Sequence, residues 1–346
     1  MRVDKEYCMS SFLTFRYIVN EDVVFKSGMK HENFKPALQK ELILCDTVEE
    51  IENAIKKQLE NIDLNSSGLL LSGGIDSAIL ASYMPKGMKA YTAKCVAEGA
   101  IDETERAKNY CKIYGLQHKI IDIEWKDYLE NIDKLMLRDG CPVFANEPQV
   151  YKLVEEMKKD GVTNIILGDN ADTAFGGMDK LLSKDWSYEE FKERYTFVEP
   201  EKVLYRPVDM DEVYKVYKNK TNGINFVKFL NEILAASSSG AYINAFKMAG
   251  VTWLDPYAHL GMSKPLDLQR VRSGESKYLL RMLFKKRYPE LDIPEKIAMP
   301  RAVNQWMEKW DGPCRPEFIH GCAEGLSGEQ RFMIYSLERF LNLIGE

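Results

Sequence analysis

The stretch Gly68-Leu69-Leu70-Leu71-Ser72-Gly73-Gly74-Ile75-Asp76-Ser77 decides the fold of this chain. Its apolar beginning predicts a short buried strand, and the residues from about Asp76 to Met84 predict a helix that follows at once. The two glycines let the backbone turn tightly and come close to a ligand, while the start of the helix offers free amides and a positive dipole end. The stretch therefore predicts a strand, a loop that cradles an anion, and a helix.

Two features separate this loop from other phosphate-binding loops. It lacks the Gly-Lys-Ser/Thr ending of a Walker A loop, and it lacks the GxGxxG pattern of a dinucleotide-binding fold. An acid inside the cradle, Asp76, would repel bare phosphate. A divalent cation between the two would remove that repulsion, so the loop predicts a bound Mg²⁺.

Strands and helices alternate along the first half of the chain. Short apolar runs predict strands at residues 68–71, 88–93, 118–123 and 164–167. Helical patterns fill the gaps between them, at about 76–84 and 102–114 and through Val150 to Met157. Strands joined by helices of this length predict an α/β fold, with a parallel sheet that carries helices on both faces. Ligands of such folds bind at the carboxyl ends of the strands.

The flanking regions differ from this core. From about Asp179 onward helical patterns dominate, and they lie at 189–195, 211–217, 226–235, 277–284 and 330–344. Before the core, the β-rich run Phe12–Val19 predicts an extended arm, and the capping box Thr47–Glu50 begins the helix that leads into the core. We therefore expect an N-terminal arm at 1–46, an α/β core at 47–180 and a mostly helical C-terminal lobe at 181–346.

Composition and charge exclude several classes of protein for this chain. The 47 basic and 53 acidic residues give a net charge of −6, which provides no broad basic field for nucleic acid. No segment has the apolar run of a signal peptide or of a membrane span. The seven cysteines form no CxxC pair and no zinc pattern, which indicates reduced thiols. We expect a cytoplasmic protein that binds neither nucleic acid nor membranes.

The motifs resemble those of a known family. Residues 72–77 resemble the SGGxDS loop of the N-type ATP pyrophosphatases, which cleave ATP between the α and β phosphates. The segment Gly168-Asp169-Asn170-Ala171-Asp172-Thr173-Ala174-Phe175-Gly176-Gly177 resembles the G-E-G-A-D-E-L-F-G-G motif of asparagine synthetases, β-lactam synthetases and lasso-peptide cyclases. Residues 276–281 are similar to the K-Y-L-L-R helix of that family, and 299–301 fall at its R-P-K segment. The resemblance implies an adenine nucleotide alpha hydrolase-like fold and the formation of an amide.

The resemblance also implies a role for each residue of the motifs. ATP would be bound by Leu71, Ser72, Gly73, Gly74, Asp76, Ser77, Ala93, Lys94 and Gly168. Asp76 and Asp172 would hold Mg²⁺. Lys277 would stabilise charge on the α-phosphate, and Arg301 would either neutralise the departing pyrophosphate or pair with a surface acid. Asp169 is the candidate general base that takes a proton from the amine.

Departures from the family pattern bear on the substrates. Arg2 stands where the glutaminase domain of asparagine synthetases has its nucleophilic cysteine, so we expect no glutaminase activity and leave open a separate glutaminase or amine-delivering subunit. Asp169 is one methylene shorter than the Glu of the family, and Thr173 replaces its second acid. Leu254 falls where the family has an arginine, so the acid substrate need not be aspartate.

We expect an ATP-dependent ligase that adenylates a carboxylate, releases pyrophosphate and condenses the adenylate with ammonia or an amine. Two alternatives stay open. The first keeps the fold but transfers sulfur from a cysteine persulfide, for which Cys95 and Cys141 lie near the expected strand ends. The second is a non-catalytic nucleotide-binding subunit that partners a separate glutaminase, and its support is the replacement at Asp169 and Leu254.

Overall fold

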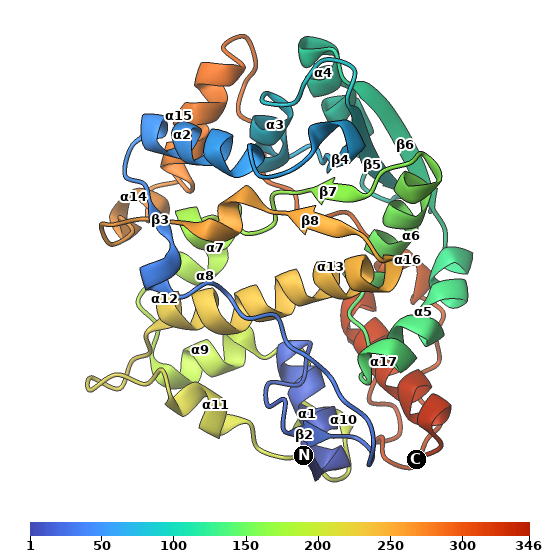
Figure 1. The fold of residues 1–346 in the computed structure, drawn as a ribbon. Coiled ribbons are helices and arrows are strands. Elements are labelled where there is room, and N and C mark those ends of the chain that lie inside the picture. The colour runs from blue at the N-terminus through green and yellow to red at the C-terminus, as the bar shows by residue number, and fades with distance from the viewer.

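A five-stranded parallel sheet forms the centre of the computed structural model, which describes residues 1–346. The strands lie in the order β6-β5-β4-β7-β8 (Figure 1). They are β4 (Ser67–Leu70), β5 (Lys89–Cys95), β6 (Gln117–Ile123), β7 (Asn164–Ile166) and β8 (Thr252–Leu254). Every neighbouring pair is parallel, which confirms the predicted parallel sheet.

The order of the strands fixes where a ligand can bind. The chain goes from β4 to β5 and β6 on one side, and it then returns to place β7 on the other side of β4. The connections that leave β4 and β7 therefore run in opposite directions, which opens a crevice at the carboxyl ends of these two strands. The glycine-rich loop follows β4, and the loop before Asp169 follows β7.

Helices cover both faces of the sheet, as predicted. Alternate strand residues point to opposite faces, and neighbours such as Ile165 and Ile166 accordingly belong to two separate hydrophobic clusters. The first face packs against α2 (Val48–Leu59), α3 (Ile75–Ala81), α4 (Thr104–Tyr114) and α15 (Tyr278–Arg287). The second face packs against α5 (Trp125–Asp139), α6 (Asn146–Lys159) and α13 (Ala235–Ala249).

The edge strand β8 and helix α15 come from the part of the chain that was expected to form only the helical lobe. β8 pairs with β7 over Thr252 to Leu254. It escapes detection because it has only three residues and lies at the edge, where Trp253 is exposed. The lobe residues 181–346 therefore also supply a strand and a helix to the α/β layer.

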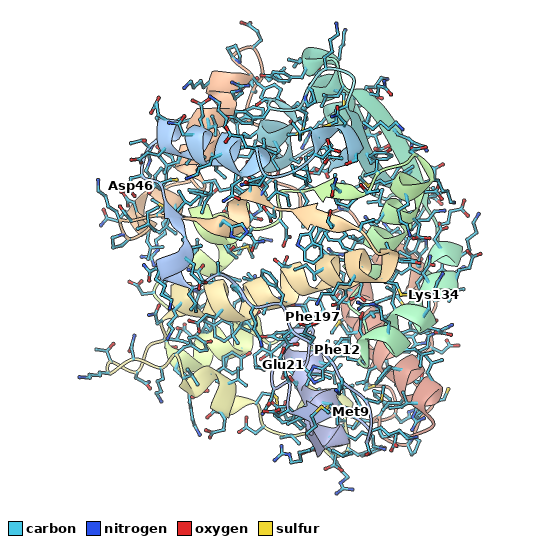
Figure 2. All side chains as sticks on the ribbon, viewed as in Figure 1. Met9, Phe12, Glu21, Asp46, Lys134 and Phe197 are labelled. Atoms are coloured by element: carbon cyan, nitrogen blue, oxygen red, sulfur yellow. The ribbon has the colours of Figure 1, made fainter.

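The N-terminal segment corrects a second expectation. Residues Lys5–Phe15 form the helix α1 instead of an extended arm. Asp4 caps this helix by accepting a hydrogen bond from the Tyr7 amide at 2.9 Å. All residues from Cys8 to Phe15 are buried, and three of them are serine or threonine, so the helix is buried all round and shows no amphipathic period that sequence analysis could detect. Figure 2 shows Met9 and Phe12 of this helix in the lower half of the molecule, with Phe197 nearby.

The remaining elements complete the lower half of the molecule and its connections (Figure 1). The helices are α7 (Ala171–Phe175), α8 (Asp179–Leu182), α9 (Tyr188–Tyr195), α10 (Pro200–Val203), α11 (Asp211–Lys215), α12 (Phe226–Phe229), the π-helical η3 (Leu230–Leu234), α14 (Leu268–Arg272), α16 (Val303–Trp306) and α17 (Gly328–Ile344). Two parallel pairs of short strands join β1 (Arg2–Val3) to β2 (Val23–Val24) and β3 (Ile43–Leu44) to β9 (Leu260–Gly261). The 3-10 turns are η1 (Gln39–Glu41), η2 (Leu64–Ser66) and η4 (Pro256–His259).

Two further predictions can be compared with the structure. All seven cysteines are free thiols, as the sequence indicated. None of the helices combines the length and the apolar character that a membrane crossing requires.

Candidate active site

The loops after β4 and β7 meet at a cavity of about 410 Å³. Ser72, Gly74, Asp76 and Ser77 of the first loop line it, together with residues 167–170 of the second. This is the crevice that the strand order predicts. The cavity also receives side chains from α6, from α13 and from the segment between α15 and α16.

Two serines shape the glycine-rich loop. The Ser77 hydroxyl accepts a hydrogen bond from the Ser72 amide at 3.0 Å, and the two hydroxyl oxygens are also 3.0 Å apart. Ser72 Oγ in turn accepts a hydrogen bond from the Gly74 amide at 3.1 Å. These bonds tie the loop to the first turn of α3, so its curved form is present without a ligand.

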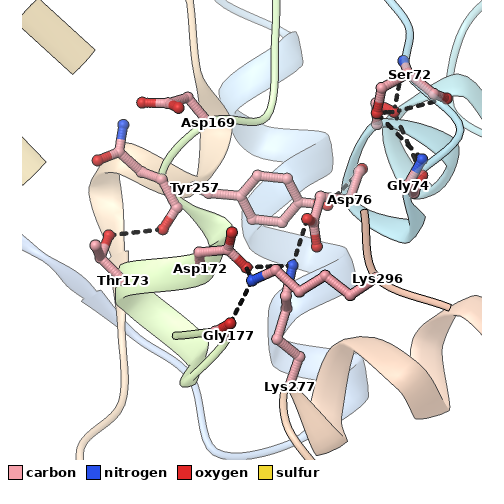
Figure 3. Close-up of polar contacts among 12 residues, drawn as sticks. Ser72, Gly74, Asp76, Asp169, Asp172, Thr173, Gly177, Tyr257, Lys277 and Lys296 are labelled. Atoms are coloured by element: carbon pink, nitrogen blue, oxygen red, sulfur yellow. Dashed lines mark hydrogen bonds and ion pairs between the residues drawn. The ribbon is translucent and has the colours of Figure 1, made fainter. Parts of the chain in front are cut away.

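A cluster of four charges lies beside this loop (Figure 3). Lys277 Nζ is 2.5 Å from Asp76 Oδ2 and 2.5 Å from Asp172 Oδ1. Lys296 Nζ is 2.9 Å from the same Asp172 oxygen. The two acids come from the two loops and the two lysines from the C-terminal half, so the cluster joins distant parts of the chain.

Lys277 is a buried group. Its side chain is only 7% exposed, which rules out the solvated helix lysine that its sequence context also allowed. It lies just before α15 and not within it, and its backbone is left-handed with φ 52°. Burial alone would lower the pKa of its ammonium, but Asp76 and Asp172 outweigh burial and raise it. The lysine is therefore a fixed positive charge.

The pKa values of the two acids in the cluster shift in opposite directions. Burial raises the pKa of Asp76, and the attraction of Lys277 only partly offsets this. Burial also acts on Asp172, but Lys277 and Lys296 outweigh it and lower the pKa of that carboxyl. The close packing depends on Gly177, because a Cβ atom there would overlap Asp172 Oδ1 and Lys277 Cε.

The cluster suits a Mg²⁺ ion. Asp76 Oδ1 is buried and has no hydrogen-bond partner, so one carboxylate oxygen is free to become a ligand. Magnesium in nucleotide sites is held by one or two carboxylates together with phosphate oxygens, and no cluster of three protein ligands is present or needed. Two carboxylates and two ammonium groups sum to zero charge, which leaves the charge of a triphosphate unbalanced. Asp76 and Asp172 are the residues that would hold the ion.

Asp169 lies apart from the charged cluster, at another wall of the cavity (Figure 3). Its carboxylate accepts hydrogen bonds from Ser238 Oγ at 3.0 Å and from Ser239 Oγ at 2.8 Å, both on α13. Burial, with a second contribution from the Asp255 carboxylate, raises its pKa to about 7. A carboxyl with this pKa is suited to accept a proton near neutral pH.

Asp255 holds the Asp169 loop in place. One of its oxygens, Oδ2, accepts hydrogen bonds from the amides of Asp169 at 3.0 Å and Asn170 at 2.9 Å. The Asn170 side-chain amide donates a third bond to the same oxygen at 2.9 Å. Asp255 follows β8, so the edge strand that sequence analysis missed delivers the group that holds the loop of Asp169.

Comparison with known proteins agrees with these motifs. The family model described as asparagine synthase matches residues 47–239, which is more than half of the chain. The chain belongs to the asparagine synthase family. The matched range begins at the predicted boundary between the arm and the core, and it ends at Ser239, which holds Asp169.

One relative from an archaeon is similar to part of this chain. The relative named "Putative asparagine synthetase [glutamine-hydrolyzing] 2" from Methanocaldococcus jannaschii is 29% identical over 150 residues. The match covers 42% of this chain and 28% of the length of that relative.

Two solved structures are similar over 72% of this chain and 97% of theirs. One is an NH3-dependent NAD synthetase from Campylobacter jejuni, with 16% identity and a TM-score of 0.26. The other is an NMN synthetase from Francisella tularensis, with 12% identity and a TM-score of 0.28. At TM-scores this low, the fold assignment rests on the sheet topology itself.

Most of the residues predicted from the family motifs line the cavity. Of the predicted ATP-binding residues, Gly73 and Lys94 are the two whose atoms do not form its wall. Gly73 packs against Glu103, whose Cβ would lie 2.9 Å from a Cβ at that glycine. The Lys94 side chain pairs with Asp102 at 3.3 Å and is exposed. For all nine residues, the role in binding ATP stays a prediction.

Arg301 lies at the wall of the cavity but does not contact the glycine-rich loop. Its guanidinium lies 2.5 Å from Glu329 Oε1 and 2.6 Å from Asn146 Oδ1. The partner acid lines the cavity, and its side chain is 28% exposed, so Arg301 pairs with a half-buried acid at the cavity wall. Lys296 is the second cation beside the loop, and sequence analysis missed it.

Four further residues of the site were not among the predicted site residues. Lys296 lies in the segment before Met299, and Asp255 lies within the half-kept motif around Leu254. Ser238 and Ser239 belong to a run of three serines inside α13. Serines in the middle of a buried helix were the one signal that could have pointed to this wall.

Proposed function

We propose that the protein is an ATP-dependent ligase that adenylates a carboxylate and condenses the acyl-adenylate with an amine or ammonia. One observation carries the proposal: a phosphate loop with a two-acid, two-lysine cluster and a carboxyl of pKa about 7 line the same cavity. Family membership supports it, because the match over residues 47–239 includes the motifs around Asp76 and Asp169, and the segment around Lys277 resembles a third motif of that family.

The first step activates the acid. A carboxylate oxygen of the substrate attacks the α-phosphorus of ATP, the bond to the bridging oxygen breaks, and pyrophosphate leaves. The loop 72–77 would bind the pyrophosphate through its amides and hydroxyls. Lys277 would stabilise the negative charge that grows on the α-phosphate oxygens, and its burial strengthens this interaction. Lys296 would do the same for pyrophosphate.

Magnesium would assist this step from Asp76 and Asp172, by neutralising charge on the phosphate oxygens when it is bound. The free Asp76 Oδ1 and the zero net charge of the protein cluster support this assignment.

The second step forms the amide. The nitrogen attacks the carbonyl carbon of the adenylate, the carbon–oxygen bond to AMP breaks, and one proton must leave the nitrogen. Asp169 would accept that proton, and this role is supported by its position in the cavity wall and by the two serine hydroxyls that donate to its carboxylate. Its pKa of about 7 keeps it partly ionised at neutral pH.

The sulfur-transfer alternative gains no support from the thiols. Burial raises the pKa of both the Cys95 and the Cys141 thiol, which disfavours the reactive thiolate. Cys95 Sγ also lies 3.5 Å from Gln149 Oε1 in a packed environment. The non-catalytic alternative fits poorly with a cluster that keeps both predicted magnesium ligands and the lysine.

Product analysis tests the proposed function. The protein is incubated with Mg-ATP, ammonium and a panel of carboxylic acids that begins with aspartate. We expect one acid to produce AMP and pyrophosphate, and we expect Asp76→Ala and Lys277→Ala to stop this production while the protein stays folded. ADP and phosphate as products would overturn the mechanism. A biological effect that persists in both variants would favour the non-catalytic subunit.

A further inference from the structure

A second cavity lies directly behind the proposed reaction site. Its volume is about 480 Å³, and it is enclosed by the end of α5, the first turn of α6, the middle of α13 and the segment 30–34. Arg16, Phe144 and Ser237 line both cavities, so they form the wall between them. The charged cluster around Lys277 lines only the first cavity.

Unpartnered polar atoms gather on the wall of the second cavity. Seven buried side-chain atoms in the chain have no hydrogen-bond partner, and five belong to residues of this wall. They are Arg16 Nε, His31 Nδ1, Asp139 Oδ2, Glu147 Oε1 and Ser237 Oγ. An unpaired buried polar atom costs about 1–3 kcal/mol, so such atoms are rare in packed cores. Their concentration in one place indicates a wall built for a ligand.

Most of these atoms accept hydrogen bonds. Glu147 and Asp139 are only 3% and 6% exposed, and each presents a carboxyl oxygen. His31 Nε2 lies 2.8 Å from the Val23 carbonyl and so carries the ring proton, which makes Nδ1 an acceptor. Arg16 Nε is the one obligate donor. A ligand that satisfies this wall has several donors at one end and an acceptor at the other.

The charged residues of the second cavity also fit a ligand with donors at one end and an acceptor at the other. Asp139 pairs with Arg138 at 2.6 Å, and Lys247 pairs with Glu32 at 2.6 Å where the segment 30–34 closes the cavity. Glu147, Arg16 and Lys30 line the same wall and form no ion pair, and of these Glu147 and Arg16 have a buried polar atom without a hydrogen-bond partner. Burial and the Asp139 carboxyl, which lies close enough to share a proton with Glu147, raise the pKa of Glu147, and the nearby Arg138 offsets this only in part.

Arg16 is held rigidly at the junction of the two cavities. Its guanidinium carbon lies 5.5, 5.8 and 5.3 Å from the ring centres of Phe144, Tyr195 and Phe197. Its backbone has φ 71°, a left-handed conformation that is rare for a side chain of this size. Its guanidinium donates one hydrogen bond, from Nη2 to the Tyr195 hydroxyl at 3.4 Å, and it has no carboxylate partner, so its free Nε is suited to bind an anionic group.

We propose that the second cavity binds the zwitterionic head group of the amine substrate, which is a diamino acid: its ammonium meets Glu147 and its carboxylate meets Arg16. The second amino group of this substrate extends past Phe144 and Ser237 into the first cavity. This inference rests on the proposed function and names its amine. A single ammonia molecule is about the size of water and would leave most of the 480 Å³ unfilled.

The wall between the two cavities favours the amine substrate over the acid substrate as the occupant of the second cavity. Ser237 precedes the two serines that hold Asp169, the proposed base. A chain that passes Ser237 therefore reaches the base, whereas the acid substrate must reach the α-phosphate beside Lys277. Gly240 lines the second cavity from α13, and a Cβ atom there would meet no atom within 4 Å. This glycine leaves the room that the head group needs.

Calorimetric titration tests the proposal without requiring catalysis. The probes are 2,3-diaminopropionate, ornithine and lysine, with putrescine as the analogue of ornithine that lacks the carboxylate. We expect at least one diamino acid to bind. We expect putrescine to bind about tenfold more weakly, because it loses about one charge-assisted hydrogen bond. Glu147→Gln and Arg16→Asn should each weaken binding by about the same factor. Asparagine tolerates the left-handed backbone of residue 16, so the fold should survive.

Two further variants sharpen the test. Glu155→Gln makes the same substitution further along α6, where Glu155 pairs only with Lys158, and it should leave binding unchanged. Gly240→Met should fill the second cavity and abolish diamino acid binding. If the proposed ligase function is wrong, product analysis will show no acid-dependent release of pyrophosphate. The titration measures binding alone, so its result does not depend on that assay. The inference is overturned if no diamino acid binds, if Glu147→Gln and Arg16→Asn leave binding unchanged, or if a dicarboxylic amino acid binds through these residues and starts adenylation itself.

Discussion

Asp169 is the residue whose ionisation changes in the neutral pH range. Its pKa lies at about 7 because burial and Asp255 disfavour its charged form, although two serine hydroxyls donate to it. Below this pH the carboxyl is protonated and cannot accept a proton from the amine. If Asp169 is the base, the rate of amide formation therefore depends on the fraction of Asp169 that is ionised.

The rate of the second step should rise as the pH passes upward through about 7 and then level off. Asp169→Asn should lower this rate about 10²–10⁴-fold and remove its pH dependence, because a general base of this kind contributes that factor. Single-turnover amide formation, started by adding amine to the preformed adenylate, measures the step. Pyrophosphate release in the same variant is the reference. An equal loss in both steps would mean that Asp169 serves adenylation instead.

The same residue should affect stability in a pH-dependent way. Asp169 binds its proton more tightly in the folded protein, with a pKa of about 7, than at its ordinary value of 3.8. The resulting stabilisation is complete below the ordinary value and is lost as the pH rises through about 7. Asp169→Asn should therefore gain free energy of unfolding relative to wild type between about pH 4 and about pH 8. Urea denaturation at both ends of this range measures the gain, with the exposed Asp179→Asn as the control; a constant difference would contradict the assigned pKa.

At the scale of elements, the site depends on how closely two loops approach. The segment after α7 passes against the ion cluster at Gly177, where a Cβ would overlap Asp172 Oδ1 and Lys277 Cε. Gly177→Ala should force the acid and the lysine apart and lower acid-dependent AMP formation by at least about tenfold, the scale of a lost charge-assisted contact. Steady-state assays of AMP formation measure this.

Gly161→Ala is the matched control for this substitution. Gly161 has φ 84° with no atom near its Cβ position, and it lies in the turn between α6 and β7, away from the cavity. It should lose about 1 kcal/mol of stability from backbone strain but keep its activity. Full activity in the Gly177→Ala protein would show that the cluster is not needed in this form.

The elements also show what the sequence could and could not reveal. The strand, loop and helix around Gly73 followed from an apolar run, two glycines and the family motif, and they are present as β4 and α3. β8 was missed because three residues at a sheet edge give no periodic signal. Asp255, Ser238 and Ser239 were missed as site residues because their role depends on contacts between segments about 70 to 86 residues apart.

At the scale of the whole molecule, the two ends of the chain close the lower half together (Figure 1). Lys5 pairs with Glu317 at 3.2 Å, and Lys26 donates to the Ile344 carbonyl at 2.7 Å. Helix α1 thus belongs to the core that also contains α17, and it delivers Arg16 to the junction of the two cavities. The N-terminal segment thus belongs to the core and also lines both cavities.

Removing one side chain of α1 should destabilise the whole protein. Phe12 is fully buried in the core that joins both ends of the chain. Phe12→Ala should cost about 3–5 kcal/mol of unfolding free energy, the usual cost of a large cavity in a core. Val3→Ala, at an exposed position nearby, should change stability by no more than about 0.5 kcal/mol. Chemical denaturation compares the two variants, and a loss below about 1 kcal/mol for Phe12→Ala would indicate that α1 is a detachable arm.

The most direct test of the central claim is exchange of labelled pyrophosphate into ATP in the absence of any amine. Only an enzyme that reversibly forms an acyl-adenylate can return pyrophosphate to ATP in a reaction that depends on the acid. We expect acid-dependent exchange in the wild type, its loss by about 10²–10³-fold in Lys277→Met, and its retention in Lys285→Met, which changes an exposed lysine of α15, the helix that Lys277 precedes. Acid-dependent release of ADP and phosphate without any pyrophosphate exchange would contradict the account.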